Sequence, residues 1–327
     1  MRILVTNDDG IDAIGLHVLA RAMQTIGKVT VIAPDQEYSG CSAALWPMSG
    51  VKPEAYRASI DGIDEEEVWA LKGPPGLCVA LACLGAFNGS FDLVVAGINP
   101  GTNLGRSINH SGTLGACITA RSYGISGIAI SQMVDTMVPT VRRQPADNAE
   151  EATESQTAQH RNKQHSNSGE TKQNDDSWDD DNLQQITDLV TQEWHTAAEI
   201  AVSAIKGLVS VASDDPVVMN INVPNRKLSE IKGWKRTEIG VDPLRVIQKA
   251  TLELRSGHIN TYDVKLSKGE KVEQPIHTDG GAVLSGWVSV SWLCRLEQEA
   301  SVQRAGQLSA ESRLDKLFAS DTTANTR

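Results

Sequence analysis

Short apolar runs alternate with stretches of helical periodicity through most of the chain. The first run, residues 3–5, ends at the turn residues 7–10, and apolar side chains then recur at helical spacing from residue 14 to residue 26. A second apolar run follows at residues 28–34. Strand, helix and strand in this order are typical of a βαβ unit, so the pattern predicts an open, mostly parallel α/β sheet.

The same alternation predicts the later elements. Strands are expected at residues 68–71, 91–96, 127–131 and 217–224, and helices at residues 77–84, 111–120 and 183–208. Residues 236–262 alternate weakly around a turn at Gly257, which indicates extended, hairpin-like arms, and the stretch 278–292 ends in a clean alternating strand. A chain of this length can bury one large α/β core or two smaller ones.

One segment breaks this pattern. From about residue 142 to residue 181 the chain is rich in Gln, Asn, Ser, Asp and Glu and has almost no apolar side chains. Residues 144–181 alone hold ten acidic and three basic side chains, which is seven of the eleven net negative charges of the chain. Such a segment cannot bury enough apolar surface to offset its ordering entropy, so it is interpreted as a disordered acidic insertion.

The division of the chain follows from these observations. We expect a Rossmann-like core with the candidate site at residues 1–141, the insertion at 142–182, the remainder of the core at 183–232, extended β arms with the final core strand at 233–293, and a polar tail at 294–327.

Composition narrows the class of protein. The chain has 327 residues, of which 40% are hydrophobic and 22% charged, as in ordinary globular proteins. No apolar run is long enough to span a bilayer, and the N-terminus has no signal-peptide pattern. Five widely spaced cysteines without a Cys-x-x-Cys pair indicate reduced thiols, so we expect a cytoplasmic protein. The net charge of −11 argues against binding of duplex nucleic acid.

The first candidate site lies directly after the first strand, where Asp8 and Asp9 are adjacent. Ligands of open α/β sheets bind at the carboxyl ends of the strands. Two neighbouring carboxylates repel each other, and a hard divalent cation is their natural partner. The alternative is an ordinary solvated turn, since Asp and Gly are common turn residues, and spacing alone does not decide between the two.

A second candidate is an anion site further along the chain. The loop at residues 97–105 is rich in Gly and Asn, and Ser111 or Thr113 can cap the helix that follows. A helix N-terminus favours anions, and Gly112 has no Cβ that would keep a phosphate from the backbone.

Taken together, these motifs resemble those of one family, the SurE or survival protein E family of metal-dependent 5′/3′-nucleotidases. The segments that carry the resemblance lie in order along the chain: Ile3 to Gly10, Ala33–Pro34 with Ser39–Gly40, Ala96 to Gly105, Ser111 to Gly115, Asn220 to Pro224, and Thr278–Asp279 leading to Gly286–Val290. The resemblance implies a Rossmann-like core with a smaller C-terminal β-rich arm used in oligomerisation. It also implies nucleoside monophosphates as substrates and, in some members, short polyphosphate.

The resemblance further implies the site residues. The metal ligands would be Asp8, Asp9, Ser39 and Asn99, with Asp8 and Asp9 also catalytic and Mg²⁺ or Mn²⁺ as the cofactor. Asn103 and the turn of Ser111, Gly112 and Thr113 would hold the phosphate. The expected assembly is a homodimer or homotetramer, without membrane partners.

The chain departs from the family pattern in places that bear on specificity. Pro74 to Val79 replaces the usual Thr-Pro-Ala-Asp-Cys-Val, which removes a polar cap and a carboxylate beside the expected pocket. In the arm, Glu253 to Gly257 replaces the usual Asp-Pro-Arg-Gly turn. Because of these changes, the nucleotide preference and the oligomer geometry stay open. The expected metal site is unaffected by them.

Other function classes fit less well. A dinucleotide-dependent oxidoreductase would need a Gly-x-Gly-x-x-Gly fingerprint, which is absent after the first strand. Ser39 lies in no Gly-x-Ser-x-Gly elbow, which argues against a triad hydrolase. A metal-dependent sugar-nucleotide transferase and a non-catalytic nucleotide-binding scaffold stay open as alternatives. His110, next to the turn of Ser111, Gly112 and Thr113, is interpreted as a structural residue rather than a general acid of the reaction.

Overall fold

The computed structural model describes residues 1–45, 52–87, 89–134, 192–210, 215–241, 245–256 and 259–293. The predicted insertion at 142–182 and the tail at 294–327 lie outside these residues, as do the start of the predicted helix at 183–191 and the turn residue Gly257.

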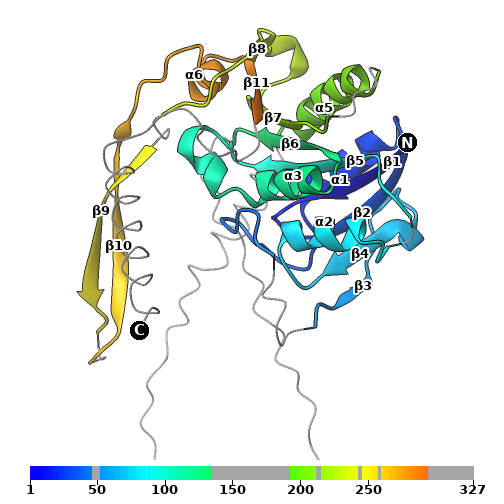
Figure 1. The fold of residues 1–327 in the computed structure, drawn as a ribbon. Coiled ribbons are helices and arrows are strands. Elements are labelled where there is room, and N and C mark those ends of the chain that lie inside the picture. Colours follow the sequence, from blue (N-terminus) through cyan, green and yellow to red (C-terminus); the bar gives the residue numbers. More distant parts are fainter. Residues whose placement is uncertain are drawn as a thin grey trace, which may run out of the picture. The chain divides into compact units, whose positions relative to one another are not determined.

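The core is a mixed sheet with helices on both faces (Figure 1). The described strands of this sheet lie in the order β3-β4-β2-β1-β5-β6-β7-β11-β8. The central run is parallel: β4 Val68–Leu71, β2 Lys28–Pro34, β1 Arg2–Thr6, β5 Leu93–Pro100, β6 Ser126–Gln132 and β7 Val218–Val223. Strand β11, Val288–Leu293, is antiparallel to β7, and β8, Trp234–Arg236, runs parallel to β11. Strand β3, Ala55–Arg57, pairs antiparallel with β4. The predicted Rossmann-like fold class is confirmed.

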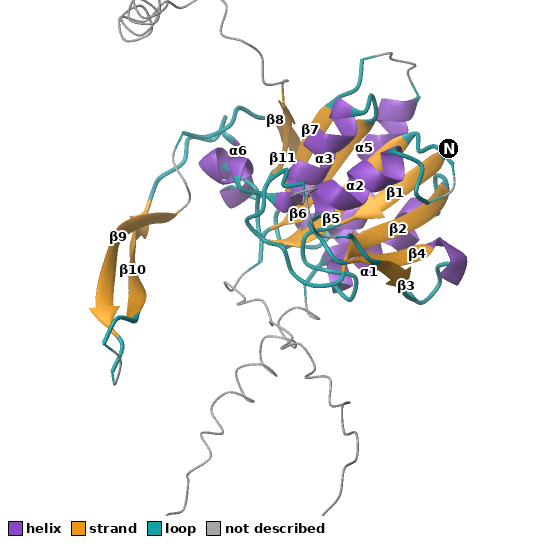
Figure 2. Cartoon of the chain, turned by 60° about the horizontal axis from the view of Figure 1, so that its bottom comes forward, coloured by secondary structure: helices purple, strands orange, loops and turns teal. Residues whose placement is uncertain are grey.

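Two hydrophobic clusters lie on opposite faces of the sheet. Helices α1, Ile14–Met23, and α5, Trp194–Val209, bury their apolar side chains in one cluster. Helices α2, Pro75–Cys83, and α3, Gly112–Ser122, pack in the other. Figure 2 shows these helices flanking the strands. Both faces of the parallel strands are therefore covered, which explains why the strands are continuous apolar runs in the sequence.

Local sequence explains where these helices begin and how closely they pack. Pro75 occupies the first turn of α2, where its missing N–H costs no hydrogen bond. Ser111 caps α3, and its Oγ accepts a hydrogen bond of 3.1 Å from the backbone N–H of Leu114. In α1, a Cβ on Gly15 would lie 2.1 Å from the carbonyl oxygen of Ile98, so only glycine lets this helix pack against β5.

The strand order places a topological switch point at β1. The chain moves from β1 to β2 and β4 on one side, and then returns to place β5 on the other side of β1. The helix after β1 and the helix before β5 cover opposite faces of the sheet. Ligands of such sheets bind in the crevice at this point, outside the carboxyl ends of the strands. The residues that follow β1 and those at the end of β5 meet there.

A separate two-stranded antiparallel sheet lies between the core strands β8 and β11 in the sequence (Figure 2). It consists of β9, Arg245–Leu254, and β10, Tyr262–Lys271. The register pairs Tyr262 with Leu254 and Val264 with Leu252, so these apolar side chains share one face of the hairpin. This sheet is the hairpin-like arm that the sequence predicts, although its strands lie at 245–271 rather than within 236–262.

The other differences from the sequence prediction have local causes. Strand β5 continues to Pro100, beyond the predicted end at residue 96, because β6 goes on pairing with it at Asn99 and Pro100. The short helix α6, Asp279–Leu284, was not predicted, since its Gly280–Gly281 pair has poor helix propensity. Three single-turn 3₁₀ helices complete the described elements, at η1 Glu65–Glu67, η2 Gly105–Asn109 and η3 Leu228–Glu230. Among the described helices, none has the length and apolar character needed to cross a membrane.

Candidate functional site at the carboxyl ends of β1 and β5

Asp8 occupies the switch point directly after β1 and is buried, with 3% of its surface exposed. The turn around it is fixed by its own polar groups, because Asn7 Nδ2 donates a 2.9 Å hydrogen bond to the carbonyl oxygen of Gly10. The loop that follows β2 is held against it, since the backbone N–H of Tyr38 donates to the carbonyl oxygen of Asp8 at 2.7 Å. The sequence therefore folds an acidic residue into the crevice instead of exposing it in a solvated turn.

The Asp8 carboxylate faces the N-terminus of α3. Thr113 Oγ1 donates a 2.6 Å hydrogen bond to Asp8 Oδ1, and the backbone N–H groups of Gly112 and Thr113 also stabilise the carboxylate. Asp8 Oδ2 lies 2.8 Å from the point that a Cβ on Gly112 would occupy. The Gly112 and Thr113 donors, which the sequence analysis expected to bind a phosphate, therefore bind the Asp8 carboxylate in this structure. The space beside Gly112 that was expected to admit an anion is occupied by the Asp8 side chain.

Burial dominates the electrostatics of the two adjacent acids. Burial raises the pKa of Asp8, opposed by its hydrogen bond from Thr113. The pKa of Asp9 rises well above its ordinary value, first through burial and then through the negative charges of Asp8 and Glu37. Asp9 Oδ2 is buried and accepts no hydrogen bond from the residues that the structure describes. Both acids would be stabilised in their ionised form by a cation beside them.

Asn99 brings a third oxygen to the same place. Its Oδ1 lies 3.4 Å from Thr113 Oγ1, whose single hydrogen is directed at Asp8, while its Nδ2 donates to the carbonyl oxygen of Gly101 at 2.7 Å. The hydrogen bond to Gly101 fixes the amide so that its oxygen faces Thr113. Thr113 therefore joins two of the predicted metal ligands, which come from β1 and β5.

Ser39 lies at the end of β2 in an exposed loop. Its neighbour Tyr38 carries the backbone hydrogen bond to Asp8. The same loop is packed tightly onto α3, since a Cβ on Gly115 would lie 2.0 Å from the carbonyl oxygen of Ser42. The loop that carries Ser39 is therefore held to Asp8 and to α3 through its other residues, and the Ser39 side chain itself is exposed.

Asn103 is buried and held through its backbone by two asparagines of β7. Its N–H donates to Asn222 Oδ1 at 2.8 Å, and its carbonyl oxygen accepts from Asn220 Nδ2 at 3.0 Å and from Asn222 Nδ2 at 3.1 Å. Its own Nδ2 donates to Ser131 Oγ at 2.8 Å. Sequence reasoning gave these asparagines no role. The available signal was two Asn residues at alternate positions of an otherwise apolar strand, which places both on one face.

With this geometry in place, the chain was compared with known proteins. The family model described as "Survival protein SurE" matches residues 3–175, which is more than half of the chain. A protein named "5'-nucleotidase SurE" from Aeromonas hydrophila is 30% identical over 240 residues, which cover 73% of this chain and 72% of that protein. The chain belongs to the SurE family.

Other SurE proteins agree with this assignment over different extents. The "5'-nucleotidase SurE" of Acinetobacter baylyi is 42% identical over 131 residues, 40% of this chain and 48% of that protein, so the chain spans about half the length of this relative. The crystal structure of the SurE protein from Aquifex aeolicus has a TM-score of 0.63 and 23% sequence identity, and the match covers 97% of this chain and 100% of that one. This structure shows that the fold is shared.

The residues of this SurE-family site fit a hard cation. The donors are carboxylate, amide and hydroxyl oxygens, which suit Mg²⁺ or Mn²⁺. The unpartnered buried oxygen of Asp9 and the repulsion between the two acids are the features that a cation would relieve. In the described part of the chain, no group of three or more His, Cys, Asp or Glu side chains could hold a metal ion. This SurE-family site would therefore rely on its two acids and on neutral oxygens.

Cys41 was also missed by the sequence analysis. Its Sγ lies 2.9 Å from the Cβ position of Gly112, as close to that point as the Asp8 carboxylate. Burial, with the charge of Asp8, raises the pKa of the Cys41 thiol to about 11. The thiol is therefore protonated at neutral pH and fills space beside Asp8 rather than acting as a nucleophile.

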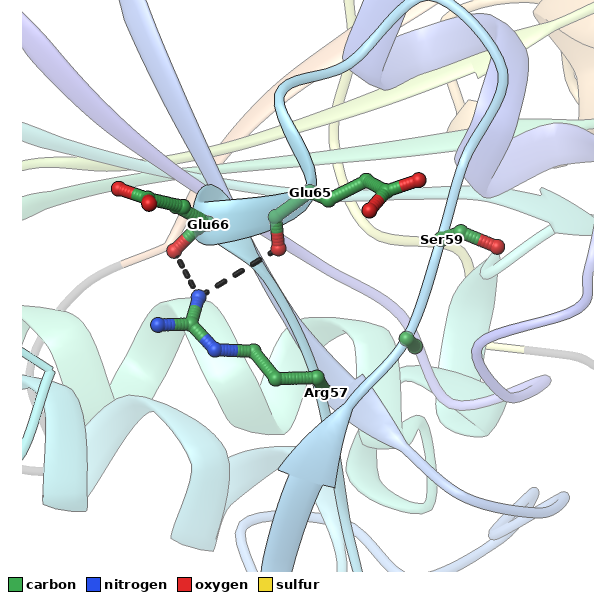
Figure 3. Close-up of a pocket in the computed structure, with 5 residues that line it drawn as sticks. Arg57, Ser59, Glu65 and Glu66 are labelled. Carbon is green, nitrogen blue, oxygen red and sulfur yellow. Dashed lines mark hydrogen bonds between the residues drawn. The ribbon is translucent and has the colours of Figure 1, made fainter.

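Two hollows elsewhere contain none of the predicted site residues. A cavity of about 560 Å³ lies beside η1. There Arg57 donates hydrogen bonds to the carbonyl oxygens of Glu65 and Glu66 (Figure 3). The Arg57 guanidinium also lies 3.7 Å from the centre of the Trp69 ring, so its charge is already engaged. A second cavity of about 740 Å³ is lined by apolar side chains of α5, β7, β8 and β11. Neither cavity is lined by the acidic and amide side chains that lie at the switch point.

The contact of Thr113 with Asp8 and Asn99 yields a first test. Thr113→Val keeps the shape but removes the hydroxyl that donates to Asp8. Because hydrogen bonds to charged groups contribute about 1.5–3 kcal/mol, we expect Mn²⁺ affinity to fall by at least ~10-fold. Thr113→Ser, which keeps the hydroxyl, should bind Mn²⁺ nearly as well as the wild type. Titration calorimetry measures both, and equal affinity of the Val variant and the wild type would show that the hydroxyl does not orient these ligands.

Proposed function

We propose that this SurE-family chain is a metal-dependent phosphomonoester hydrolase that releases phosphate from nucleoside monophosphates, a 5′/3′-nucleotidase that also acts on short polyphosphate. The observation that carries the proposal is the buried Asp8 carboxylate at the N-terminus of α3, with Asp9 next to it in the chain and the Asn99 oxygen in contact with the same threonine, Thr113. The names of the Aeromonas and Acinetobacter relatives support it.

Asp8, Asp9, Asn99 and Ser39 would hold Mg²⁺ or Mn²⁺. Bound there, the cation would neutralise charge on the phosphoryl group and make a coordinated water more acidic. The chain contributes the orientation of the ligands: Thr113 fixes Asp8 and Asn99, and the Gly101 carbonyl oxygen fixes the Asn99 amide. Burial of the acids excludes water and strengthens their interaction with a cation.

Phosphate binding falls to the groups at the start of α3 and in the loop before it. A cation at the site would offset the negative charge of Asp8. The positive end of the α3 dipole would then also attract a second anion, the phosphate of the substrate. Asn103, which is buried and fixed by β7, would bind this phosphate together with Ser111, Gly112 and Thr113 at the start of the helix.

The proposed function is tested by phosphate release from a panel of 5′- and 3′-nucleoside monophosphates and short polyphosphate, with added Mg²⁺ or Mn²⁺ and with EDTA. We expect release with the metals and none with EDTA. Release that persists in EDTA would contradict the metal mechanism. Binding of nucleoside diphosphate without any phosphate release would instead favour a transferase.

We further propose that the arm formed by β9 and β10 associates with a second copy of the chain. Its apolar face carries Leu252, Leu254, Tyr262, Val264 and Leu266, which are each between 52% and 68% exposed. An isolated two-stranded hairpin is marginally stable in water, so this face requires a partner surface.

The four described cysteines are free thiols, which supports a reducing, cytoplasmic setting.

A charge on the apolar face of the arm should break this association. Leu252→Glu with Val264→Glu alters a cross-strand pair on the apolar face, and we expect the assembly to dissociate into monomers in light-scattering chromatography. The matched control is Thr251→Glu with Lys265→Glu, a cross-strand pair on the opposite face, which should leave the mass unchanged. Equal masses for both double variants would rule out the apolar face as the interface.

A further inference from the structure

Asp279, the first residue of α6, is buried, with 1% of its surface exposed, and accepts hydrogen bonds from three separate backbone N–H groups. Its Oδ2 accepts from Gly105 at 2.8 Å, and its Oδ1 accepts from Gly240 at 2.9 Å and from Gly280 at 2.8 Å. Gly105 lies 174 residues away along the chain. A single carboxylate therefore joins three segments, and nothing in the proposed chemistry requires it there.

The first of these segments belongs to the candidate site. Gly105 follows Asn103 by two residues and ends the loop that begins after Asn99, and its φ of 53° favours glycine. The β7 asparagines hold this loop at Asn103, and Asp279 holds it again at Gly105. Two anchors in three residues fix the course of the loop that carries Asn103 and follows Asn99 at the end of β5.

The second segment leads to the arm. Gly240 lies between β8 and β9, and a Cβ there would come within 3.1 Å of Asp279 Oδ1. Two backbone hydrogen bonds reinforce the contact: the Glu238 N–H donates to the His277 carbonyl oxygen at 3.1 Å, and the Asp279 N–H donates to the Glu238 carbonyl oxygen at 2.9 Å. The segment after β8, at Glu238 and Gly240, is thereby fixed to α6.

We propose that Asp279 is a positioning residue, which holds the Asn99–Gly105 loop in its working geometry and ties it to the root of the β9–β10 arm. This role deepens the proposed function and rests on it, since the loop carries a metal ligand and a phosphate ligand of the proposed site. Loss of a carboxylate oxygen here leaves a buried N–H unpaired, which the loop can relieve only by moving.

The two carboxylate oxygens make the proposal unusually specific to test. In Asp279→Asn, the single carbonyl oxygen can replace Oδ1 and keep two hydrogen bonds, or replace Oδ2 and keep one. The first orientation is favoured, so the amide NH₂ turns toward the Gly105 N–H and only the contact with the loop is lost. Asp279→Ala removes all three contacts. The Asn variant should therefore release the loop while the arm root stays attached.

Hydrogen exchange and kinetics separate the two contacts. In Asp279→Asn we expect the Gly105 amide to exchange at least ~10-fold faster, with Gly240 unchanged, because one hydrogen bond to a charged group is lost. The KM for nucleoside monophosphate should rise at least ~10-fold, with a smaller change in kcat and a melting temperature near that of the wild type. Asp279→Ala should release both amides. The matched control is Asp92→Asn, an exposed acid that also accepts a backbone N–H, from Arg2 at 2.7 Å, and should change neither readout.

The outcomes are decisive in each direction. Unchanged exchange at Gly105 in Asp279→Asn would overturn the proposal, and so would faster exchange with unaltered kinetics, since the contact would then be structural only. If the wild type released no phosphate, the proposed function would fail on its own. Exchange at Gly105, together with Mn²⁺ binding to the wild type and to Asp279→Asn, would then still test whether Asp279 positions the loop.

Discussion

Replacing Asp8 with asparagine should lower phosphate release by at least ~100-fold, the scale of losing several kcal/mol of transition-state charge stabilisation. Asparagine keeps the shape of the side chain but removes the buried charge of Asp8, one of the two acidic charges that would hold the cation. The expected result has two parts, a fall in kcat and a loss of Mn²⁺ binding by calorimetry. Both are measured on protein that retains the circular dichroism spectrum of the wild type.

The control for this variant is Asp12→Asn. Asp12 is exposed and lies four residues further along, so Asp12→Asn removes one acidic charge at the surface near Asp8. We expect its phosphate release to stay within a factor of ~2 of the wild type, as for an ordinary surface substitution. Near-normal turnover of a folded Asp8→Asn protein would remove the basis for the metal mechanism.

The second large effect is expected at Gly115, where the Ser39 loop crosses α3. A Cβ at this position would lie 2.0 Å from the Ser42 carbonyl oxygen and 2.3 Å from its carbon, so backbone must move. Overpacking of this kind costs about 1–3 kcal/mol, and the loop is the element that can yield. We expect Gly115→Ala to lower the melting temperature and, because the loop carries Ser39 and binds Asp8 through Tyr38, to weaken Mn²⁺ binding at least ~10-fold.

Gly207→Ala is the matched control for Gly115→Ala. Both glycines lie in helices, but a Cβ on Gly207 would meet no heavy atom of the described residues within 4 Å. Since alanine is favoured over glycine in a helix by about 1 kcal/mol, this variant should melt slightly higher and bind Mn²⁺ normally. If Gly115→Ala bound Mn²⁺ as tightly as Gly207→Ala does, the position of the Ser39 loop would be irrelevant to the site.

The order of strands and helices could be predicted from the sequence because each element buries a continuous apolar face. Strands β2 and β4 have the predicted bounds, and Ser111 caps α3 as expected. Asp8 and Asp9 could be placed at the crevice because a buried strand leads directly into an acidic turn. Patterns of this kind depend only on residues that are close in the sequence, so they can be recognised without knowledge of the tertiary contacts.

The contacts within the site could not be predicted, because they join residues that are remote in sequence. Thr113 and Asp8 are 105 residues apart, and Asn103 is fixed by asparagines more than 115 positions away. Gly112 shows the limit clearly. Its missing Cβ was interpreted as space for a phosphate, but that space holds Asp8 and Cys41. A Gly112→Val variant would therefore disturb the acidic pair together with any anion site.

The separation between Thr113 and Asp8 also has a consequence for the order of folding. Parallel strands on either side of β1 pair only after the intervening chain has closed long loops, so we expect the β1–β5 crevice to form late in folding. Oxygens that converge so late cannot bind a cation in the folding transition state. A bound cation would therefore slow unfolding while leaving the refolding rate nearly unchanged. The cofactor would lengthen the lifetime of the folded state without making the protein fold faster.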